Sequence, residues 1–330
     1  MPEASPSAVG TTAAKTADTT DRGTPSVCLC VPTFRRPDGL RKLLAHVAQL
    51  DYRGSISVVV VDNDAEYRAA ATVVDELAPA FPFPLACVVE PQRGHTFASN
   101  RSFVAGCRVD PVPTYIAVLD DDQYPDPNWL TEMISTALRF DADLVGGPTL
   151  PVFEAPDHWV ARTGLYGPIR CATGRVPMIW ASGNMLIRRS VLEQYLDEPF
   201  LNDFAFTGGG DIEFFWRCRR DGRSFAWAGE ARAFETIPQW RTTVGWLLRR
   251  RFGYGVTATR VERIYVKTPS GTVRRWCKGL GLLGFGVLSL PIAAFGGRHA
   301  IMHSLIQAVR GTGRIAAEFG ILYEEYRNPR

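Results

Sequence analysis

Apolar and polar residues alternate along the first 140 residues in blocks that predict strands followed by helices. Continuous apolar runs, which are typical of strands buried on both faces, occur at residues 27–31, 56–61, 85–89 and 115–119. Segments with apolar residues at helical spacing follow these runs at residues 38–49, 66–78, 97–107 and 127–140. We therefore predict an α/β fold with a Rossmann-like, mostly parallel central sheet and helices on both of its faces.

The pattern becomes less regular in the second half of the chain. A short strand is expected at 143–147, a long loop at 148–177, and an apolar run at 179–188 contains Ser182-Gly183-Asn184. Thr207-Gly208-Gly209-Gly210-Asp211 then forms a glycine-rich loop that leads into a helix ending at Gly222. Glycines in such a loop let the backbone approach a ligand closely.

Three consecutive carboxylates, Asp120, Asp121 and Asp122, directly follow the apolar run at 115–119. Like charges in a row repel one another, and a bound Mg²⁺ or Mn²⁺ would offset this repulsion because both prefer oxygen ligands. Mg²⁺ is usually held by one or two carboxylates together with substrate phosphates, so we expect a nucleoside diphosphate to complete the site. The alternative interpretation is a solvated acidic turn before the next helix. Asp62 ends the strand at 56–61 and is expected on the same edge of the sheet.

Asp211 stands at the start of a predicted helix, where two interpretations are open. Asp is favoured at helix N-termini, an effect of about 1 kcal/mol, and this alone explains its presence. A functional role is favoured because three preceding glycines exceed what a helix cap requires. In single-displacement glycosyl transfer, Asp211 would accept the proton of the attacking hydroxyl while a metal neutralises the leaving diphosphate. A glycoside hydrolase would instead need two facing carboxyl groups and no metal.

Six short motifs occur in a fixed order between residues 27 and 255. They are Val31-Pro32-Thr33-Phe34-Arg35-Arg36, Val61-Asp62-Asn63, the loop at 94–100, Leu119-Asp120-Asp121-Asp122, Ser182-Gly183-Asn184 and Gly210-Asp211-Ile212-Glu213. Together they resemble the family 2 inverting glycosyltransferases, which have a GT-A fold. The segments 122–130 and 246–252 are similar to the exopolysaccharide branch of that family, the succinoglycan-type glucosyltransferases.

The resemblance implies roles for individual residues. The nucleotide of a nucleotide-sugar donor, UDP by analogy with the family, would contact Pro32, Thr33, Arg35, Asp62, Arg93, Gly94, Asp120 and Asp121. Asp120 and Asp122 would form the DxD motif that holds Mg²⁺ or Mn²⁺. The donor sugar or the acceptor would contact Gly183, Asn184, Glu213 and Arg250, and Asp211 would be the general base.

Two positions depart from the family pattern. Gly210 stands where the family often has Glu, and we expect Glu213 to take over part of that role. The loop before the third helix reads Ala98-Ser99-Asn100-Arg101 instead of Ala-Arg-Asn, which displaces a diphosphate-side arginine to Arg101.

Composition narrows the choice of partner and compartment. The formal net charge of +3 over 330 residues is too small to indicate nucleic-acid binding, and no nucleic-acid partner is expected. Seven scattered cysteines without CxxC spacing are typical of reduced core thiols in a cytoplasmic protein. Residues 1–24 are rich in Ala, Thr, Ser and Pro without an apolar segment, which predicts a disordered tail. The catalytic domain is expected at 25–262.

Residues 263–330 are expected to form a helical region that associates with a membrane. The segment 279–297 is uncharged, and basic residues flank it at Arg274, Arg275, Lys278 and Arg298. Six glycines and Pro291 argue against one straight spanning helix, so an anchor on the inner face of the cell membrane is favoured. A transmembrane span and a soluble buried hairpin are the alternatives. The run 249–251 consists of three arginines that either bind phosphates of the donor or of a polyprenyl-linked acceptor, or form a solvated helix face.

The sequence thus predicts a metal-dependent inverting glycosyltransferase that moves a hexose to a lipid-linked glycan or similar acceptor. A sugar nucleotidyltransferase is the alternative enzyme, but it would need a Gly-rich loop where this chain has residues 32–36. A noncatalytic sugar-binding protein is the alternative from another class.

Overall fold

The computed structural model describes residues 23–163, 165–169 and 171–324. Apart from Gly23 and Thr24, the expected N-terminal tail lies outside the described residues.

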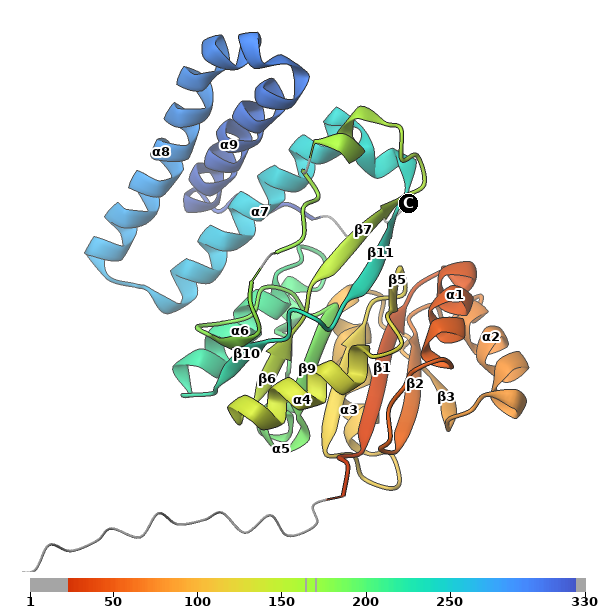
Figure 1. Cartoon of the computed structure of the whole chain (residues 1–330). Helices are drawn as coiled ribbons and strands as arrows, with labels where there is room; N and C mark the ends of the chain where they lie inside the picture. The colour runs from red at the N-terminus through yellow and green to blue at the C-terminus, as the bar shows by residue number, and fades with distance from the viewer. Residues whose placement is uncertain (1–22, 164, 170, 325–330) are drawn as a thin grey trace, which may run out of the picture.

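A central eight-stranded sheet in the order β3-β2-β1-β4-β9-β6-β10-β8 forms the body of the molecule (Figure 1). Its strands are β1 (Val27–Thr33), β2 (Ile56–Asp62), β3 (Leu85–Val89), β4 (Tyr115–Leu119), β6 (Leu144–Gly146), β8 (Gly174–Val176), β9 (Asn184–Arg188) and β10 (Phe225–Trp227). The β3, β2, β1 and β4 strands are parallel neighbours, and β6 pairs in parallel with β10. In contrast, β9 runs antiparallel between β4 and β6, and β8 runs antiparallel beside β10. The prediction of a mostly parallel sheet is confirmed.

Helices cover both faces of this sheet because successive side chains of a strand point to opposite faces. Val27, Leu29 and Val31 of β1 belong to a core with α1 (Pro37–Val47), α2 (Ala69–Leu77) and α4 (Trp129–Phe140). Cys28 and Cys30 belong to the opposite core, which contains α3 (His95–Cys107), α5 (Arg189–Leu192) and α6 (Gly210–Arg220). Each predicted helix of the first half is therefore present, with boundaries shifted by a few residues.

A second sheet corrects the expectation of a long loop at 148–177. It consists of β5 (Gln123–Pro125), β11 (Ala233–Ile237) and β7 (Thr149–Phe153), and β8 also lies within the expected loop. Pro151 lies in the middle of β7, although proline cannot donate a backbone hydrogen bond to a ladder. Its place is explained by the position of β7 at the edge, where it pairs with β11 on one side.

Three long helices complete the fold: α7 (Val244–Tyr265), α8 (Pro269–Ala293) and α9 (Gly297–Glu318). The last two form a hairpin that projects from the α/β body, and α7 lies between this hairpin and the sheets (Figure 1). Glycines allow the helices to approach closely. A Cβ at Gly286 would lie 2.3 Å from the Ala308 nitrogen, and one at Gly255 would lie 2.2 Å from the Arg310 oxygen.

Ion pairs also join the three helices, and two of them involve basic residues that flank the apolar segment. Arg275 Nε lies 2.6 Å from Glu318 Oε1, with both side chains buried. Glu262 Oε1 of α7 accepts from Lys278 Nζ at 3.0 Å and from Arg314 Nη2 at 3.2 Å. Of the three basic residues before the apolar segment, Arg275 and Lys278 are thus paired within the protein, and Lys278 remains partly exposed.

The described residues contain one helical stretch, Pro269–Glu318, that is long and apolar enough to cross a membrane by length and composition. Only 17% of its most apolar window is buried. This stretch is the α8–α9 hairpin, so its two halves run antiparallel. The expected boundary between catalytic domain and C-terminal region, at residue 262, falls within α7.

We predict that Gly286→Leu lowers the free energy of unfolding by about 1–3 kcal/mol, because the new side chain would overlap the backbone of α9. Gly281→Leu is the matched control, since a Cβ at Gly281 meets no atom within 4 Å. Urea unfolding of both variants measures the difference. Equal stability of the two variants would contradict the close packing of α8 on α9.

Candidate active site

The predicted polar residues gather at the carboxyl ends of β1, β2 and β4. Thr33 and Asp62 are register partners at the ends of β1 and β2, and Asp120 follows Leu119, the last residue of β4. Antiparallel pairing of β4 with β9 places Asn184 opposite Leu119, which brings the Ser182-Gly183 segment to the same edge. Residues separated by more than 100 positions in the sequence are therefore neighbours here.

Asp121 connects the acidic triplet to the loop after β1. Its carboxylate accepts hydrogen bonds from Thr33 Oγ1 at 2.7 Å, from the Phe34 N–H at 3.4 Å and from Arg36 Nη1 at 2.9 Å. The pKa of Asp121 is raised because burial outweighs the favourable charge of Arg36. The contacts seen here are structural, and the predicted contact of Asp121 with a nucleotide stays a prediction.

Asp122 is paired with two arginines. Arg36 Nη1 lies 2.9 Å from its Oδ2, and Arg241 Nη1 lies 3.3 Å from the same oxygen. Arg241 also contacts Glu235 Oε1 at 3.0 Å, so it joins the triplet to β11. Burial, followed by the charge of Asp122, raises the pKa of Glu235 to about 7.

Asp120 has the opposite environment. Its pKa is raised well above the ordinary value because it is enclosed by protein and because Asp122, Asp121, Glu235 and Asp211 are negatively charged neighbours. No basic side chain among the described residues forms an ion pair with it. Gly183 leaves room for this carboxylate, since a Cβ there would lie 2.3 Å from Asp120 Oδ2.

These residues fit a divalent cation that shares its ligands with a substrate diphosphate. A crowded carboxylate without a basic partner is suited to a cation, and Asp120 meets this description. Within the part of the chain that the structure describes, no group of three or more His, Cys, Asp or Glu side chains is arranged to hold a metal. Mg²⁺ sites completed by substrate phosphates need only one or two carboxylates. Asp122 would have to exchange an arginine contact in order to join Asp120 as a ligand.

Asp211 lies in the first turn of α6, after Gly208 and Gly209, whose φ angles are +70° and +93°. Its Oδ1 accepts the N–H of Ile212 at 2.8 Å. The pKa of Asp211 is raised mainly by burial, while hydrogen bonds from Ile212 and Ser182 and the charge of His95 act in the opposite direction. A carboxylate of raised pKa is a stronger proton acceptor.

Helix α7 holds the loop that carries Asp211. Arg260 donates to Thr207 Oγ1 and to the Asp203 carbonyl oxygen, both at 2.9 Å. A Cβ at Gly209 would lie 2.1 Å from Thr257 Cγ2, so glycine is required there for contact with α7 as well as for its positive φ.

Apart from Asp120 and Asp121, the residues predicted to bind the nucleotide lie at the ends of β1, β2 and β3. The guanidinium groups of Arg35 and Arg93 lie 5.1 and 5.2 Å from the centroid of the Phe34 ring. The Gly94 N–H donates to Asn63 Oδ1 at 2.8 Å. The Asp62 carboxylate accepts three backbone N–H groups, from Asp64, Ala70 and Ala71, and therefore caps α2. Its contact with a nucleotide stays a prediction, as do those of Pro32 and Thr33.

Two residues predicted to contact the donor sugar or acceptor, Asn184 and Glu213, make contacts within the protein. The Asn184 amide accepts from Trp129 Nε1 at 2.7 Å and donates to the Pro148 and Ala231 carbonyl oxygens at 3.0 and 3.1 Å. Glu213 is fully buried and contacts Arg217 and Tyr265. Their contacts with a sugar stay predictions.

A cavity of about 290 Å³ lies beside the triplet, and Arg250 and Asn184 both line it. Its other lining residues include Glu235, Trp180, Trp227, Tyr166 and Trp246, most of which sequence reasoning did not assign to the site. Glu235 could have been identified from the sequence, because it is an acidic residue within the mostly apolar run at 233–237. No feature of the sequence indicated Tyr166, since it lies in a segment expected to be a loop.

The sheet, the acidic edge of β4 and the separate carboxylate on α6 define the architecture of a GT-A glycosyltransferase. The sequence model for glycosyl transferase family 2 matches residues 28–196, and that for glycosyl transferase family group 2 matches residues 115–315. The protein therefore belongs to glycosyl transferase family 2 and is a glycosyltransferase, which excludes the nucleotidyltransferase and the noncatalytic alternatives.

Among similar proteins, the succinoglycan biosynthesis protein ExoM of Rhizobium meliloti (strain 1021) is 30% identical over 310 residues, which cover 88% of this chain and 92% of ExoM. The mannosyltransferase PcManGT from Pyrobaculum calidifontis, solved with GDP-Man and Mn²⁺, superposes with a TM-score of 0.59 at 18% identity, covering 91% of this chain and 88% of PcManGT. Residues 1–349 of S. aureus TarS, solved with UDP, superpose with a TM-score of 0.51 at 12% identity, covering 90% and 92%. The predicted family and GT-A fold are confirmed.

We predict that Asp120→Asn raises the melting temperature of the metal-free protein near neutral pH by about 2–4 °C, because it removes a charge that neighbouring carboxylates repel. The folded-state pKa of Asp120 lies above the ordinary value of 3.8, so protonated Asp120 favours folding at low pH. This contribution is lost as the pH rises through the folded-state pKa, and the benefit of Asn must therefore shrink toward pH 3.8.

Scanning calorimetry over a pH series, with metal chelated, measures this effect. Asp157→Asn is the control, since the Asp157 side chain is 95% exposed. A variant at Asp120 that is less stable than the wild type at neutral pH would show that the carboxylate is stabilised by the protein itself.

Proposed function

We propose that this protein is an inverting glycosyltransferase that moves a hexose from a UDP-sugar to a lipid-linked glycan or other polysaccharide precursor. The observation that carries the proposal is that two carboxylates, those of Asp120 and Asp211, lie at the same edge of the sheet in different surroundings. Asp120 is crowded by negative charge, as a cation ligand would be, whereas Asp211 accepts backbone N–H groups on a separate loop. Because the two carboxylates carry like charges, each raises the pKa of the other, and a bound cation would offset this effect.

In the proposed reaction, the Asp211 carboxylate accepts the proton of the acceptor hydroxyl as its oxygen attacks the anomeric carbon. The new glycosidic C–O bond forms on the face opposite the leaving group, so the configuration at the anomeric carbon is inverted. The bond to the nucleoside diphosphate breaks at the same time, and its electron pair leaves with the diphosphate. A Mg²⁺ or Mn²⁺ held by Asp120 and Asp122 would offset the charge of that leaving group.

The similar proteins support a nucleotide-sugar donor and a glycan product. PcManGT was solved with GDP-Man and Mn²⁺ and TarS with UDP, and both share the fold of this chain. ExoM, which matches over most of both chains, is named for succinoglycan biosynthesis. Arg35, Arg93 and Phe34 would surround the nucleobase at the ends of β1 and β3.

We predict that Asp211→Asn lowers the rate of transfer by about 100-fold or more, because the attacking hydroxyl loses its base. Nucleotide binding with Mn²⁺ is expected to remain, since the triplet is unchanged. The measurement is metal-dependent release of nucleoside diphosphate from UDP-glucose, UDP-galactose, UDP-GlcNAc and GDP-mannose, with membrane lipid extract as acceptor.

Asp221→Asn is the matched control, because Asp221 is an exposed residue at the opposite end of α6, where its backbone N–H and not its carboxylate caps the helix. Full activity of Asp211→Asn would remove Asp211 from the mechanism. Absence of metal-dependent release from every donor by the wild type would overturn the proposed function itself.

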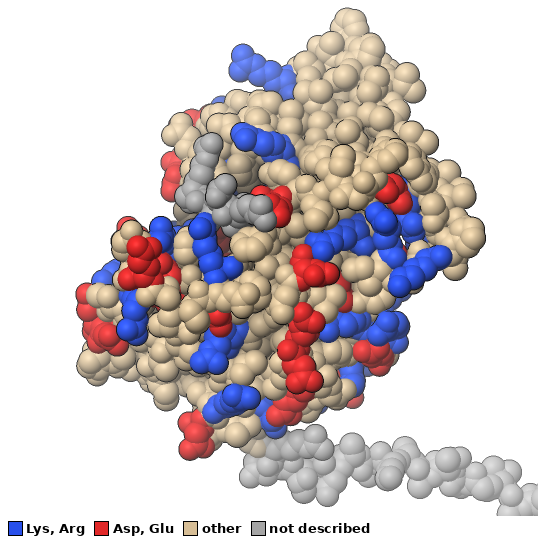
Figure 2. All heavy atoms as spheres, turned by 180° about the vertical axis from the view of Figure 1, so that it is seen from behind, with Lys and Arg blue, Asp and Glu red and all other residues tan. Residues whose placement is uncertain are grey.

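The proposed acceptor requires access to lipid, and the α8–α9 hairpin supports a position on the inner face of the cell membrane. Large apolar side chains are exposed along α8 and its end, at Leu280, Phe285, Val287, Leu288, Ile292 and Phe295. Figure 2 shows the upper part of the molecule, where the hairpin lies, as a surface with few charged side chains compared with the α/β body. Exposed Arg274 and Arg298 flank this surface and would favour an anionic leaflet.

We predict that wild-type protein floats with vesicles of phosphatidylcholine and phosphatidylglycerol and that Phe285→Asp with Leu288→Asp abolishes flotation, because charge would enter the apolar surface. Leu138→Asp is the control, since Leu138 is 57% exposed but lies on α4. Unchanged flotation of the double variant would exclude the hairpin as the membrane contact.

A further inference from the structure

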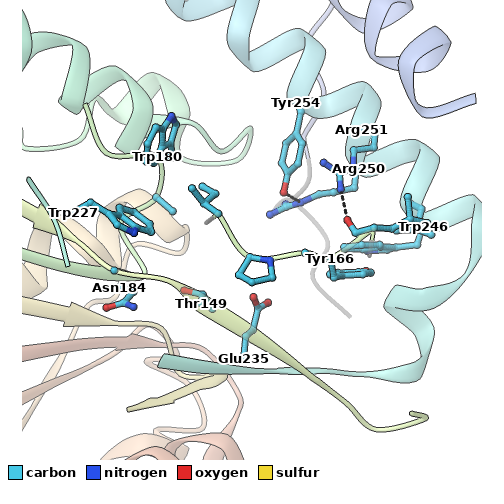
Figure 3. Close-up of a pocket in the computed structure, with 17 residues that line it drawn as sticks. Thr149, Tyr166, Trp180, Asn184, Trp227, Glu235, Trp246, Arg250, Arg251 and Tyr254 are labelled. Carbon is cyan, nitrogen blue, oxygen red and sulfur yellow. Dashed lines mark hydrogen bonds between the residues drawn. The ribbon is translucent and has the colours of Figure 1, made fainter. Parts of the chain in front are cut away.

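The cavity beside the acidic triplet has the size and lining of a site for one sugar ring. Its volume is about 290 Å³, at the lower end of the range for small-molecule sites. It lies where the two sheets meet α7, between β9, β11 and the first half of α7 (Figure 3). A nucleotide would need more space, and the residues predicted to bind it lie at the ends of β1, β2, β3 and β4, outside the lining of the cavity.

Aromatic side chains form two opposite walls of this cavity (Figure 3). Trp180 and Trp227 make an edge-to-face pair with ring centroids 5.4 Å apart. Tyr166 and Trp246 stack with an interplanar angle of 10° and centroids 6.2 Å apart. The C–H bonds of a pyranose ring pack on aromatic faces, whereas its hydroxyl groups need polar partners at the edges of the ring.

Polar groups suited to hydroxyl groups are present in the same walls. Glu235 points into the cavity from β11, and Arg250 reaches it from α7, where its Nε donates to the Tyr254 hydroxyl at 3.1 Å (Figure 3). Among the described residues, the indole N–H of Trp227 is buried without a hydrogen-bond partner. This nitrogen does not face the cavity, so the polar partners available to a sugar are Glu235, Arg250 and Tyr254.

One short segment connects the cavity to the catalytic carboxylates. Trp180 and Ala181 line the cavity, the Ser182 N–H donates to Asp211, and Gly183 lies against Asp120. From the other side, Arg241 joins Glu235 of the cavity to Asp122. The walls of the cavity are thus connected to the surroundings of Asp211, Asp120 and Asp122, although these carboxylates do not line it themselves.

We propose that this cavity binds the pyranose ring of the acceptor that carries the attacking hydroxyl group, with Trp180 as a specificity-determining residue of its wall. The inference rests on the proposed function and adds the class and location of the acceptor. Trp180 is 39% exposed, so it forms the wall that a sugar can reach from solvent. Trp227, at 4% exposure, supports Trp180 from within the core.

The test uses the full chain and octyl β-D-glucoside, octyl β-D-galactoside and octyl β-D-mannoside as acceptor probes. Binding is followed by tryptophan fluorescence, and KM for the probe is measured with the donor found active above. We expect one probe to bind saturably, and Trp180→Ala to raise its Kd and KM about tenfold. Trp180→Phe should restore most of the affinity, because it keeps an aromatic face.

Trp216→Ala is the matched control, because Trp216 is also a half-buried aromatic residue but stacks on Tyr265 outside the cavity. UDP affinity with Mn²⁺ and hydrolysis of the donor in the absence of acceptor should be unchanged in Trp180→Ala. These measurements distinguish a defect in the acceptor site from a defect in the donor site.

The proposal is overturned if no probe binds to the wild type, or if Trp180→Ala changes the KM of the donor rather than that of the acceptor. The second result would assign the cavity to the donor sugar. Either result leaves metal-dependent release of nucleoside diphosphate intact, whereas failure of the proposed function would abolish that release in the wild type.

Discussion

Repulsion among carboxylates at the end of β4 is the constraint on which the site depends. The protein resolves it differently for each member of the triplet. Asp121 is satisfied by the loop after β1, and Asp122 is satisfied by two arginines from distant segments. Asp120 is left facing other negative charges, within the described residues. A site that is fully neutralised by its own side chains has little attraction for a cation, so this incomplete neutralisation would favour the metal proposed here.

The same edge shows why one reversed strand is important. Because β9 runs antiparallel between β4 and β6, its beginning and not its end meets the carboxyl end of β4. The segment that precedes β9 therefore carries Trp180 to Gly183 across the active site. A parallel strand in this position would have placed that segment on the opposite edge of the sheet, away from Asp120 and Asp211.

Much of the fold was predictable from the sequence, because the four βα units of the first half have long and regular apolar patterns. The acidic triplet was predictable for the same reason, since it directly follows an unambiguous strand. The strands of the second sheet could not be predicted, because strands of three to five residues show no clear periodicity. In addition, β7 contains Pro151. Asn184 shows another limit: the sequence places it beside the site, but only the fold reveals that Trp129 and two carbonyl groups occupy its amide. Glu235 and Arg241 were missed because their role arises from pairing with Asp122 across the fold.

Helix α7 links the C-terminal hairpin to the loop that carries Asp211. It contacts the loop of Asp211 through Arg260 and Thr257, and it packs on α9 through Gly255 and Glu262. Because α7 contacts both, the hairpin is packed through α7 against the loop that carries Asp211 and is not an appended tether. The orientation of the protein on a lipid surface would then set the height of the acceptor cavity above that surface, and with it the length of glycan that can reach the base.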